Sequence, residues 1–117
     1  MNNLNNDSIA LIYKGEDFPL RLLMKKTNGK YYDLTGATEI TLRLKKQDGS
    51  ILEKKYTLSQ VIIVSLIGGE ILVTLSDADT TLLLEKDLQD FDVVVDKGTS
   101  RRIAFFSKRL SVRKALA

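Results

Sequence analysis

The chain has 117 residues, a formal net charge of +3 and neither histidine nor cysteine. This length suits one domain with a single hydrophobic core. The absence of cysteine excludes disulfides, thiolate nucleophiles and cysteine metal sites from this chain, and the absence of histidine removes the commonest metal ligand and general base. We therefore expect a protein that is not an enzyme and that needs no cofactor and no metal.

The first residues are polar and rich in asparagine. Residues 1–8, MNNLNNDS, predict a flexible N-terminal arm or one that a partner orders, and residues 9–117 are expected to form a single β-sandwich domain. The N-terminus lacks a basic segment, and its apolar run is too short for a signal peptide or a membrane helix. The chain is therefore expected to be made in the cytoplasm and not to enter a membrane.

Short runs in which apolar and polar residues alternate follow one another along the chain, separated by turn residues. This period of two is typical of strands with one buried face. The single proline, Pro19, lies near the start of the second run, which favours an edge position for that strand. The expected strands are 9–13, 18–25, 38–46, 51–59, 61–66, 70–75, 89–96 and 101–112.

Two of the intervening turns have a clear chemical basis. In DLTGAT, residues 33–38, Asp33 and Thr35 can bond the backbone of the turn, and Gly36 permits the chain to reverse. Asp48 and Gly49 tolerate the positive φ angles that a tight hairpin needs. Both motifs indicate where strands begin and end, so they carry information on architecture rather than on chemistry.

The pattern changes in SDADTTLLLEK, which begins at Ser76. Ser76 can cap a helix, and Asp79 stands three residues later, as in a capping box. The leucines that follow fit a short helix, which we expect over residues 77–85.

Together these elements predict an all-β fold: a two-layer antiparallel sandwich of seven or eight strands with one short helical turn. A small barrel is the alternative, because the number of strands does not separate the two architectures. The predicted core takes one apolar face from each strand. It includes Leu20, Leu22, Ile40, Leu42, Leu44, Ile71, Val73, Leu75, Leu83, Phe91, Val93, Val95 and Ile103.

The charges are sorted along the last part of the chain. Residues 70–96 contain eight acidic residues and one lysine, whereas residues 97–117 contain seven basic residues and no acidic one. The interpretation that we favour is that two oppositely charged strands pair across a sheet, or dock on copies of the same protein. Attraction to nucleic acid or to acidic lipid is the alternative. Stacking aromatic residues, which usually accompany nucleic-acid binding, are limited to Phe105 and Phe106.

Neither the carboxylates nor the tyrosine pair predicts a ligand site. The segment SDADTTLLLEKD, residues 76–87, lacks the glycine and the terminal glutamate of a calcium-binding loop, and the aspartates at the predicted helix start have a structural use there. Tyr31 and Tyr32 are expected to pack at the end of the core with their hydroxyl groups in water.

The order of these pieces resembles a known family. GEDFPL at 15–20 leads to the DLTGAT turn, an alternating strand and the Asp48-Gly49 hairpin; then come GEILVTLSDADTTLL at 69–83 and two hairpin strands over 91–112. This order resembles the immunoglobulin-like sandwich domain of tailed-phage baseplate proteins, best known as the N-terminal domain of phage baseplate upper proteins. The resemblance covers most of the chain, and it implies an immunoglobulin-like sandwich with a structural role in the virion.

The expected function is therefore that of a structural virion protein of a tailed phage or prophage. Such a protein would act by protein–protein assembly in the tail or baseplate, or in the neck or as a decoration protein. Its expected partners are other phage structural proteins and copies of itself, with no small-molecule substrate and no membrane. A module that binds carbohydrate or another cell-surface ligand is the alternative, and a nucleic-acid-binding accessory protein is the third reading.

Two segments are the expected protein interface. Residues 61–66 are almost entirely apolar, so a strand formed there is either buried on both faces or covered by a neighbouring chain. The basic groups of the last strand could meet the acidic residues 87–96 of a neighbouring copy. The predicted interface residues are Val61, Ile62, Ile63, Val64, Arg101, Arg102, Lys108, Arg109, Arg113 and Lys114.

Overall fold

Eight strands in two sheets form the fold, as seen in a computed structural model that describes residues 10–26, 28–98 and 100–114. The predicted arm, Met1 to Ser8, lies outside these residues. The elements are β1 (Ala10–Lys14), β2 (Phe18–Leu23), β3 (Glu39–Lys45), β4 (Ile51–Lys55), the 3-10 helix η1 (Tyr56–Leu58), β5 (Ile62–Ser65), β6 (Glu70–Leu75), α1 (Asp77–Leu82), β7 (Lys86–Lys97) and β8 (Ser100–Lys114).

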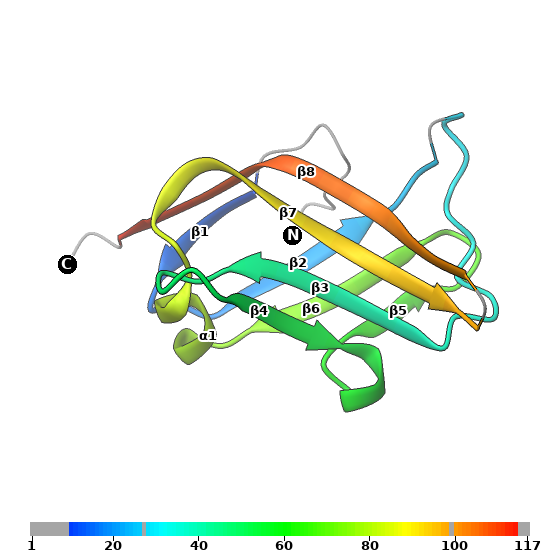
Figure 1. Cartoon of the computed structure of the whole chain (residues 1–117), viewed down its shortest axis with the longest axis horizontal. Helices are drawn as coiled ribbons and strands as arrows, with labels where there is room; N and C mark the ends of the chain where they lie inside the picture. Colours follow the sequence, from blue (N-terminus) through cyan, green and yellow to red (C-terminus); the bar gives the residue numbers. More distant parts are fainter. Residues whose placement is uncertain (1–9, 27, 99, 115–117) are drawn as a thin grey trace.

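The two sheets are the two layers of a sandwich. One has five strands in the order β1-β8-β7-β3-β4, and the other has three in the order β2-β6-β5. In Figure 1 the long strands β7 and β8 cross the whole molecule in the five-stranded layer, and α1 lies at one end. The all-β sandwich prediction is confirmed, whereas the barrel alternative is wrong because the two sheets are separate.

One strand pair departs from the antiparallel arrangement. β1 runs parallel to the end of β8, with Ala10 opposite Leu110 and Lys14 opposite Lys114. The other ladders, β2–β6, β5–β6, β3–β4, β3–β7 and β7–β8, are antiparallel. The alternation in the sequence cannot predict the parallel pairing of β1 with β8. It indicates which face of a strand is buried, but not the direction of the strand relative to a distant partner.

The predicted core is largely confirmed. Twelve of its thirteen side chains are buried, and the exception is Ile103, which is 58% exposed. The register of β7 and β8 shifts by one residue here: Val93 lies opposite Phe105, but Val94 lies opposite Ile103, so Ala104 is the extra residue of a bulge. The bulge reverses the alternation and turns Ile103 outward while Phe105 points into the core.

Further core side chains lie outside the predicted set. Phe105 packs against Phe91 with the ring centroids 5.5 Å apart. The parallel strand β1 contributes the fully buried Ile12. Other buried apolar residues beyond the predicted set include Met24, Leu34, Val61, Leu110 and Val112.

Both predicted turns form as expected. The Asp33 carboxylate accepts a hydrogen bond from the Thr35 amide at 2.8 Å, and Gly36 has φ +82°. The Asp48 carboxylate accepts one from the Ser50 amide at 2.9 Å, next to Gly49 at φ +90°. The two carboxylates thus accept hydrogen bonds from backbone amides that have no backbone carbonyl as a partner in the turn.

The predicted capping box begins α1. Ser76 Oγ accepts a hydrogen bond from the Asp79 amide at 3.1 Å, and Asp79 Oδ2 accepts one from the Ser76 amide at 3.0 Å. The helix ends at Leu82 rather than at residue 85, because Leu83 has extended backbone angles and is buried in the core. Asp79 Oδ2 also lies 2.9 Å from Lys54 Nζ, which ties α1 to β4.

A glycine allows two loops to approach closely. Gly69 has φ +65°, and a Cβ atom there would lie 2.5 Å from the carbonyl oxygen of Tyr32 and 2.8 Å from that of Met24. The Gly69 carbonyl in turn accepts a hydrogen bond from the Met24 amide at 2.9 Å. Only a residue without a side chain fits between these backbones.

We expect Gly69→Ala to destabilise the protein more than Gly49→Ala does. Both positions have positive φ, so alanine costs about 1–2 kcal/mol of unfolding free energy at each. Gly49 has no atom within 4 Å of the added methyl group. The clash at Gly69 should add about 1–3 kcal/mol. Urea denaturation of the two variants measures the difference, and equal losses would contradict the close approach.

Acid should selectively remove the stabilisation that Asp79 provides. Burial alone would raise the pKa of Asp79, but hydrogen bonds from Lys54 and Ser76 outweigh this effect and hold the pKa below its usual value of 3.8. The folded-state pKa is therefore depressed, so the stabilisation is present above the usual value and is lost as the pH falls through the folded-state pKa.

The matching experiment compares Asp79→Asn with the unaltered protein by urea denaturation from pH 7 down to about pH 3. We expect Asn to reduce the unfolding free energy by about 1–3 kcal/mol at pH 7, with the difference shrinking in acid. Asp90→Asn is the control, because the structure shows no ion pair of Asp90 among the described residues. If Asp79→Asn reduced the unfolding free energy by the same amount at every pH, the stabilisation would not depend on the negative charge of Asp79, and this prediction would be wrong.

Candidate protein-docking surfaces

The first candidate surface lies along β5. In the part of the chain that the structure describes, this strand pairs only with β6, so it forms one edge of the three-stranded sheet. Ile62 is 56% exposed and Val64 is 39% exposed, and the turn that follows exposes Leu66 and Ile67. We call these four side chains the β5 surface.

The β5 surface lacks the usual protection of a sheet edge. Soluble proteins commonly place charged residues, proline or a covering segment at an exposed edge strand, which prevents unwanted pairing. No charged residue and no proline occurs between Lys55 and Glu70. An uncharged apolar edge of this kind is typical of a surface that another protein covers.

The apolar character extends onto the outer face of the sheet. Ile62 lies opposite Leu72 of β6, and Leu72 lies opposite Arg21 of β2. Arg21 Nε is 3.0 Å from Glu70 Oε2, so the charges of this face neutralise one another. On this face, the apolar side chains of Ile62 and Leu72 therefore lie next to the Arg21–Glu70 ion pair.

Two of the predicted β5 residues are not available at this surface. Val61 is buried in the core at 2% exposure, and Ile63 is only partly exposed and packs against the core. Alternation along the strand explains the division, because Ile62 and Val64 point away from the core.

The six predicted basic residues all lie on β8, which is in a different sheet from β5. β8 belongs to the five-stranded sheet and lies next to β7, whereas β5 is the edge of the other sheet. The predicted interface residues therefore do not form one patch. They divide into an apolar set on one layer and a basic set on the other.

The acidic and basic strands pair within one chain. β7 and β8 form an antiparallel ladder in which Arg113 Nε lies 3.0 Å from Asp87 Oδ1 and Arg101 Nε lies 3.9 Å from Asp96 Oδ1. The hydrogen bond with Arg113 lowers the pKa of Asp87, and the same contact raises the pKa of Arg113. The interpretation that oppositely charged strands pair across a sheet is confirmed.

This pairing engages part of the charge that was predicted to meet a neighbouring copy, and the contact between copies stays a prediction. Arg101 and Arg113 already have acidic partners in their own chain. Asp92 is also engaged, because its two carboxylate oxygens each lie 2.6 Å from the guanidinium group of Arg43. The remaining basic residues of the predicted set, for which no ion pair is described, are Arg102, Lys108, Arg109 and Lys114.

A groove that the sequence did not predict lies beside the first half of β8. It has a volume of about 880 Å³ and runs between β8 and the loop that joins β2 to β3. Lys26 and Arg102 approach it from segments about 75 positions apart in the chain. Adjacent basic residues at 25–26 and 101–102 were the only signal in the sequence, and they do not show that the two segments meet.

The loop on one side of the groove is held in place by Lys97. Its ammonium group donates to the Asp33 carbonyl and lies 5.1 Å from the centroid of the Tyr32 ring. The Asp33 carboxylate has a lowered pKa, chiefly through its hydrogen bonds with Thr35, to which the charges of Lys97 and Lys26 add. Tyr32 is partly buried and Tyr31 is half exposed, as the packing interpretation of this pair expects.

The described residues show no arrangement typical of metal chemistry. No three acidic side chains among them come together as a group that could hold a metal ion. In the same part of the chain, no helix has the length and apolar character needed to cross a bilayer.

A solved structure has the same fold. The chain is similar to the N-terminal domain of phage TP901-1 ORF48, a baseplate protein, with a TM-score of 0.53 and 15% sequence identity. The match covers 95% of this chain and 90% of that one. No family model matches the sequence, and no curated protein is detectably similar to it. The predicted resemblance to the sandwich domain of phage baseplate proteins is thus confirmed in the fold.

Proposed function

We propose that this chain is a structural protein of a tailed-phage or prophage particle, located in the tail or baseplate and acting by protein–protein assembly. The observation that carries this proposal is the fold, which the chain shares with a phage baseplate domain over 95% of its length. A neck or decoration position in the particle is the alternative placement. The proposal also implies that the chain works without enzymatic activity, which agrees with the absence of histidine and cysteine from its sequence.

The β5 surface is the proposed contact with another structural protein of the particle. Its support is the combination of a free strand edge, four exposed apolar side chains and no charge between Lys55 and Glu70. A neighbouring strand could continue the ladder through backbone hydrogen bonds and bury Ile62 and Val64 against its own apolar residues. Such a contact needs no pre-existing pocket, which suits a protein that assembles rather than binds a small ligand.

We expect the double variant Ile62→Lys/Val64→Lys to fold but not to enter particles. Both side chains are exposed, so lysine there should change the unfolding free energy by no more than about 0.5 kcal/mol. At an apolar contact, however, two buried ammonium groups would prevent docking. The measurement is an immunoblot for the chain in particles purified by density gradient from the encoding phage or prophage.

Ile51→Lys is the matched control, because Ile51 is 47% exposed but lies on β4 of the other sheet. The unaltered chain and this control should both co-purify with particles. Absence of the unaltered chain from particles would overturn the virion role itself. Normal incorporation of the double variant would leave that role standing and remove the β5 surface from it.

Self-association is part of the same proposal, since structural proteins of particles are commonly present in several copies. If a second copy covers the β5 surface, light scattering at micromolar concentration should show an oligomer for the unaltered chain and a monomer for Ile62→Lys/Val64→Lys. A monomer in both cases would assign the surface to a different structural protein and would contradict self-association through β5.

A further inference from the structure

The first half of β8 has one side without a described strand partner. β7 pairs with β8 along its length on one side, but on the other side β1 pairs only with residues 110–114. Within the described residues, no strand lies against residues 100–109 on that second side. Backbone N–H and C=O groups therefore face the groove there, and a further strand could pair with them.

The groove next to this edge is strongly basic. Lys25, Lys26, Lys97 and Arg102 line it, together with a single carboxylate, Asp33. The Asp33 side chain is occupied by the Thr35 amide at 2.8 Å. Lys26 and Arg102 are exposed, and no ion pair of either is seen in the described part of the chain.

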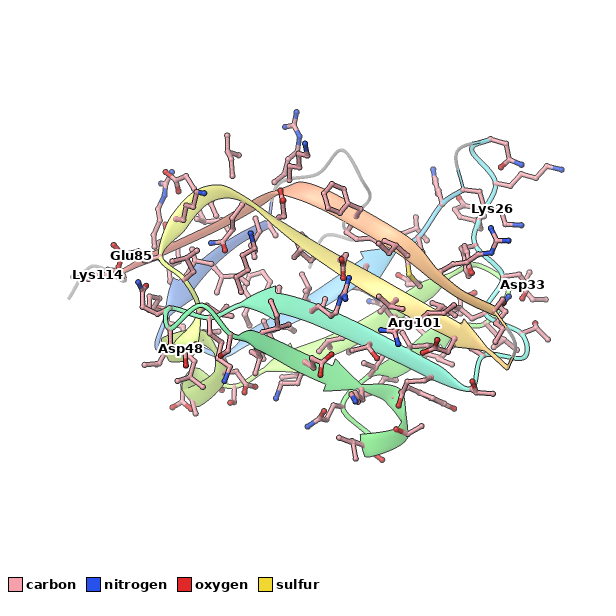
Figure 2. The ribbon with its side chains drawn as sticks, viewed as in Figure 1. Lys26, Asp33, Asp48, Glu85, Arg101 and Lys114 are labelled. Carbon is pink, nitrogen blue, oxygen red and sulfur yellow. The ribbon has the colours of Figure 1, made fainter. Side chains whose placement is uncertain are left out.

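Apolar side chains stand beside these charges. Phe106 is 42% exposed and Ile103 is 58% exposed, and both line the groove. The bulge at Ala104 is what presents them, because it turns Ile103 outward next to the free edge. Figure 2 labels Lys26 and Asp33 on the loop side and Arg101 at the same end of the molecule, whereas Asp48 and Glu85 mark the opposite end.

We propose that this groove binds an extended acidic segment of a partner protein, which adds as a further strand to the edge of β8 that lacks a strand partner among the described residues. The backbone of the segment would continue the ladder, while its carboxylates meet Lys26 and Arg102 and its apolar residues cover Phe106 and Ile103. The proposal concerns only the chemistry of this edge and does not depend on a role in a phage particle.

The occupant is a different protein rather than a second copy because the acidic strand of this chain is already engaged. Asp87, Asp92 and Asp96 of β7 pair with Arg113, Arg43 and Arg101, respectively. Nucleic acid fits the charge of the groove, but it cannot use an unpaired strand edge as a ladder partner. A polypeptide uses both the charges and the edge.

The test measures binding of a fluorescent peptide of about ten residues in which valine and glutamate alternate, a length that matches an ordinary strand. We expect the full chain to bind it, and Lys26→Ser/Arg102→Ser to bind it about tenfold more weakly, since two exposed ion pairs are lost. Lys45→Ser/Lys86→Ser is the control: it removes the same charge from exposed residues outside the groove and should bind within about twofold of the unaltered chain.

Strand addition has its own readout. The same peptide with alternate amides methylated keeps its charges but cannot complete the ladder, so it should bind about tenfold more weakly. Hydrogen exchange of the amides in residues 102–106 should slow when the unmodified peptide is bound. Equal binding of the methylated peptide, with unchanged exchange, would overturn strand addition.

Several outcomes would overturn the choice of partner. One is equal binding of a peptide that alternates valine and lysine, and another is no binding of the acidic peptide up to about 1 mM. Tighter binding of an oligothymidylate that displaces the acidic peptide would assign the groove to nucleic acid. Binding only by a chain that lacks residues 1–9 would assign it to the protein's own N-terminus. Because purified protein and peptides suffice, failure here is separate from failure to find the chain in particles.

Discussion

The antiparallel pairing of β7 with β8 is the interaction on which the rest of this fold depends. β3 adds to the outer side of β7 and brings β4 with it, and β1 adds to the far side of β8. Without the hairpin, β1 would lose the strand it pairs with, and β3 and β4 would be separated from the rest of the sheet. The hairpin also places Phe91 and Phe105 together in the core, 5.5 Å apart. It thus fixes both the order of the sheet and the centre of the apolar layer.

A bulge in this hairpin explains the one residue that the sequence placed wrongly in the core. Alternation gave the inward faces of the regular strands correctly, and local turn chemistry gave Asp33, Asp48 and the capping box, because each depends on near neighbours. Ile103 was misplaced because the extra residue at Ala104 reverses the alternation without any local signal. The end of α1 and the parallel direction of β1 were also missed, since both are decided by contacts with distant segments.

For the candidate surfaces too, the sequence predicts what belongs to one strand but not what distant segments form together. The exposed apolar character of Ile62 and Val64 could be read from a run without charge, because it belongs to one strand. The basic groove could not be predicted from the sequence, because Lys26 and Arg102 come together only when β8 lies against the β2–β3 loop. The pairing of β7 with β8 engages two of the six basic residues that the sequence assigned to contacts between copies. Arg101 and Arg113 are engaged within the sheet, whereas Arg102 lines the groove beside a stretch of β8 that has no described partner on that side.

The two surfaces differ in chemistry and belong to different layers. One is an apolar edge in the three-stranded sheet, and the other is a basic edge in the five-stranded sheet. A protein with one self-complementary surface closes as a symmetric dimer, whereas a protein with two unlike surfaces can contact two different neighbours at once. Sheet edges suit this task because their backbone groups supply directional bonds, while the side chains beside them select the partner. In this chain the apolar edge of β5 would favour a partner with an apolar surface. The basic edge of β8 would favour a partner that carries negative charge. If both proposed contacts form, the sandwich connects two unlike neighbours while its core stays unchanged.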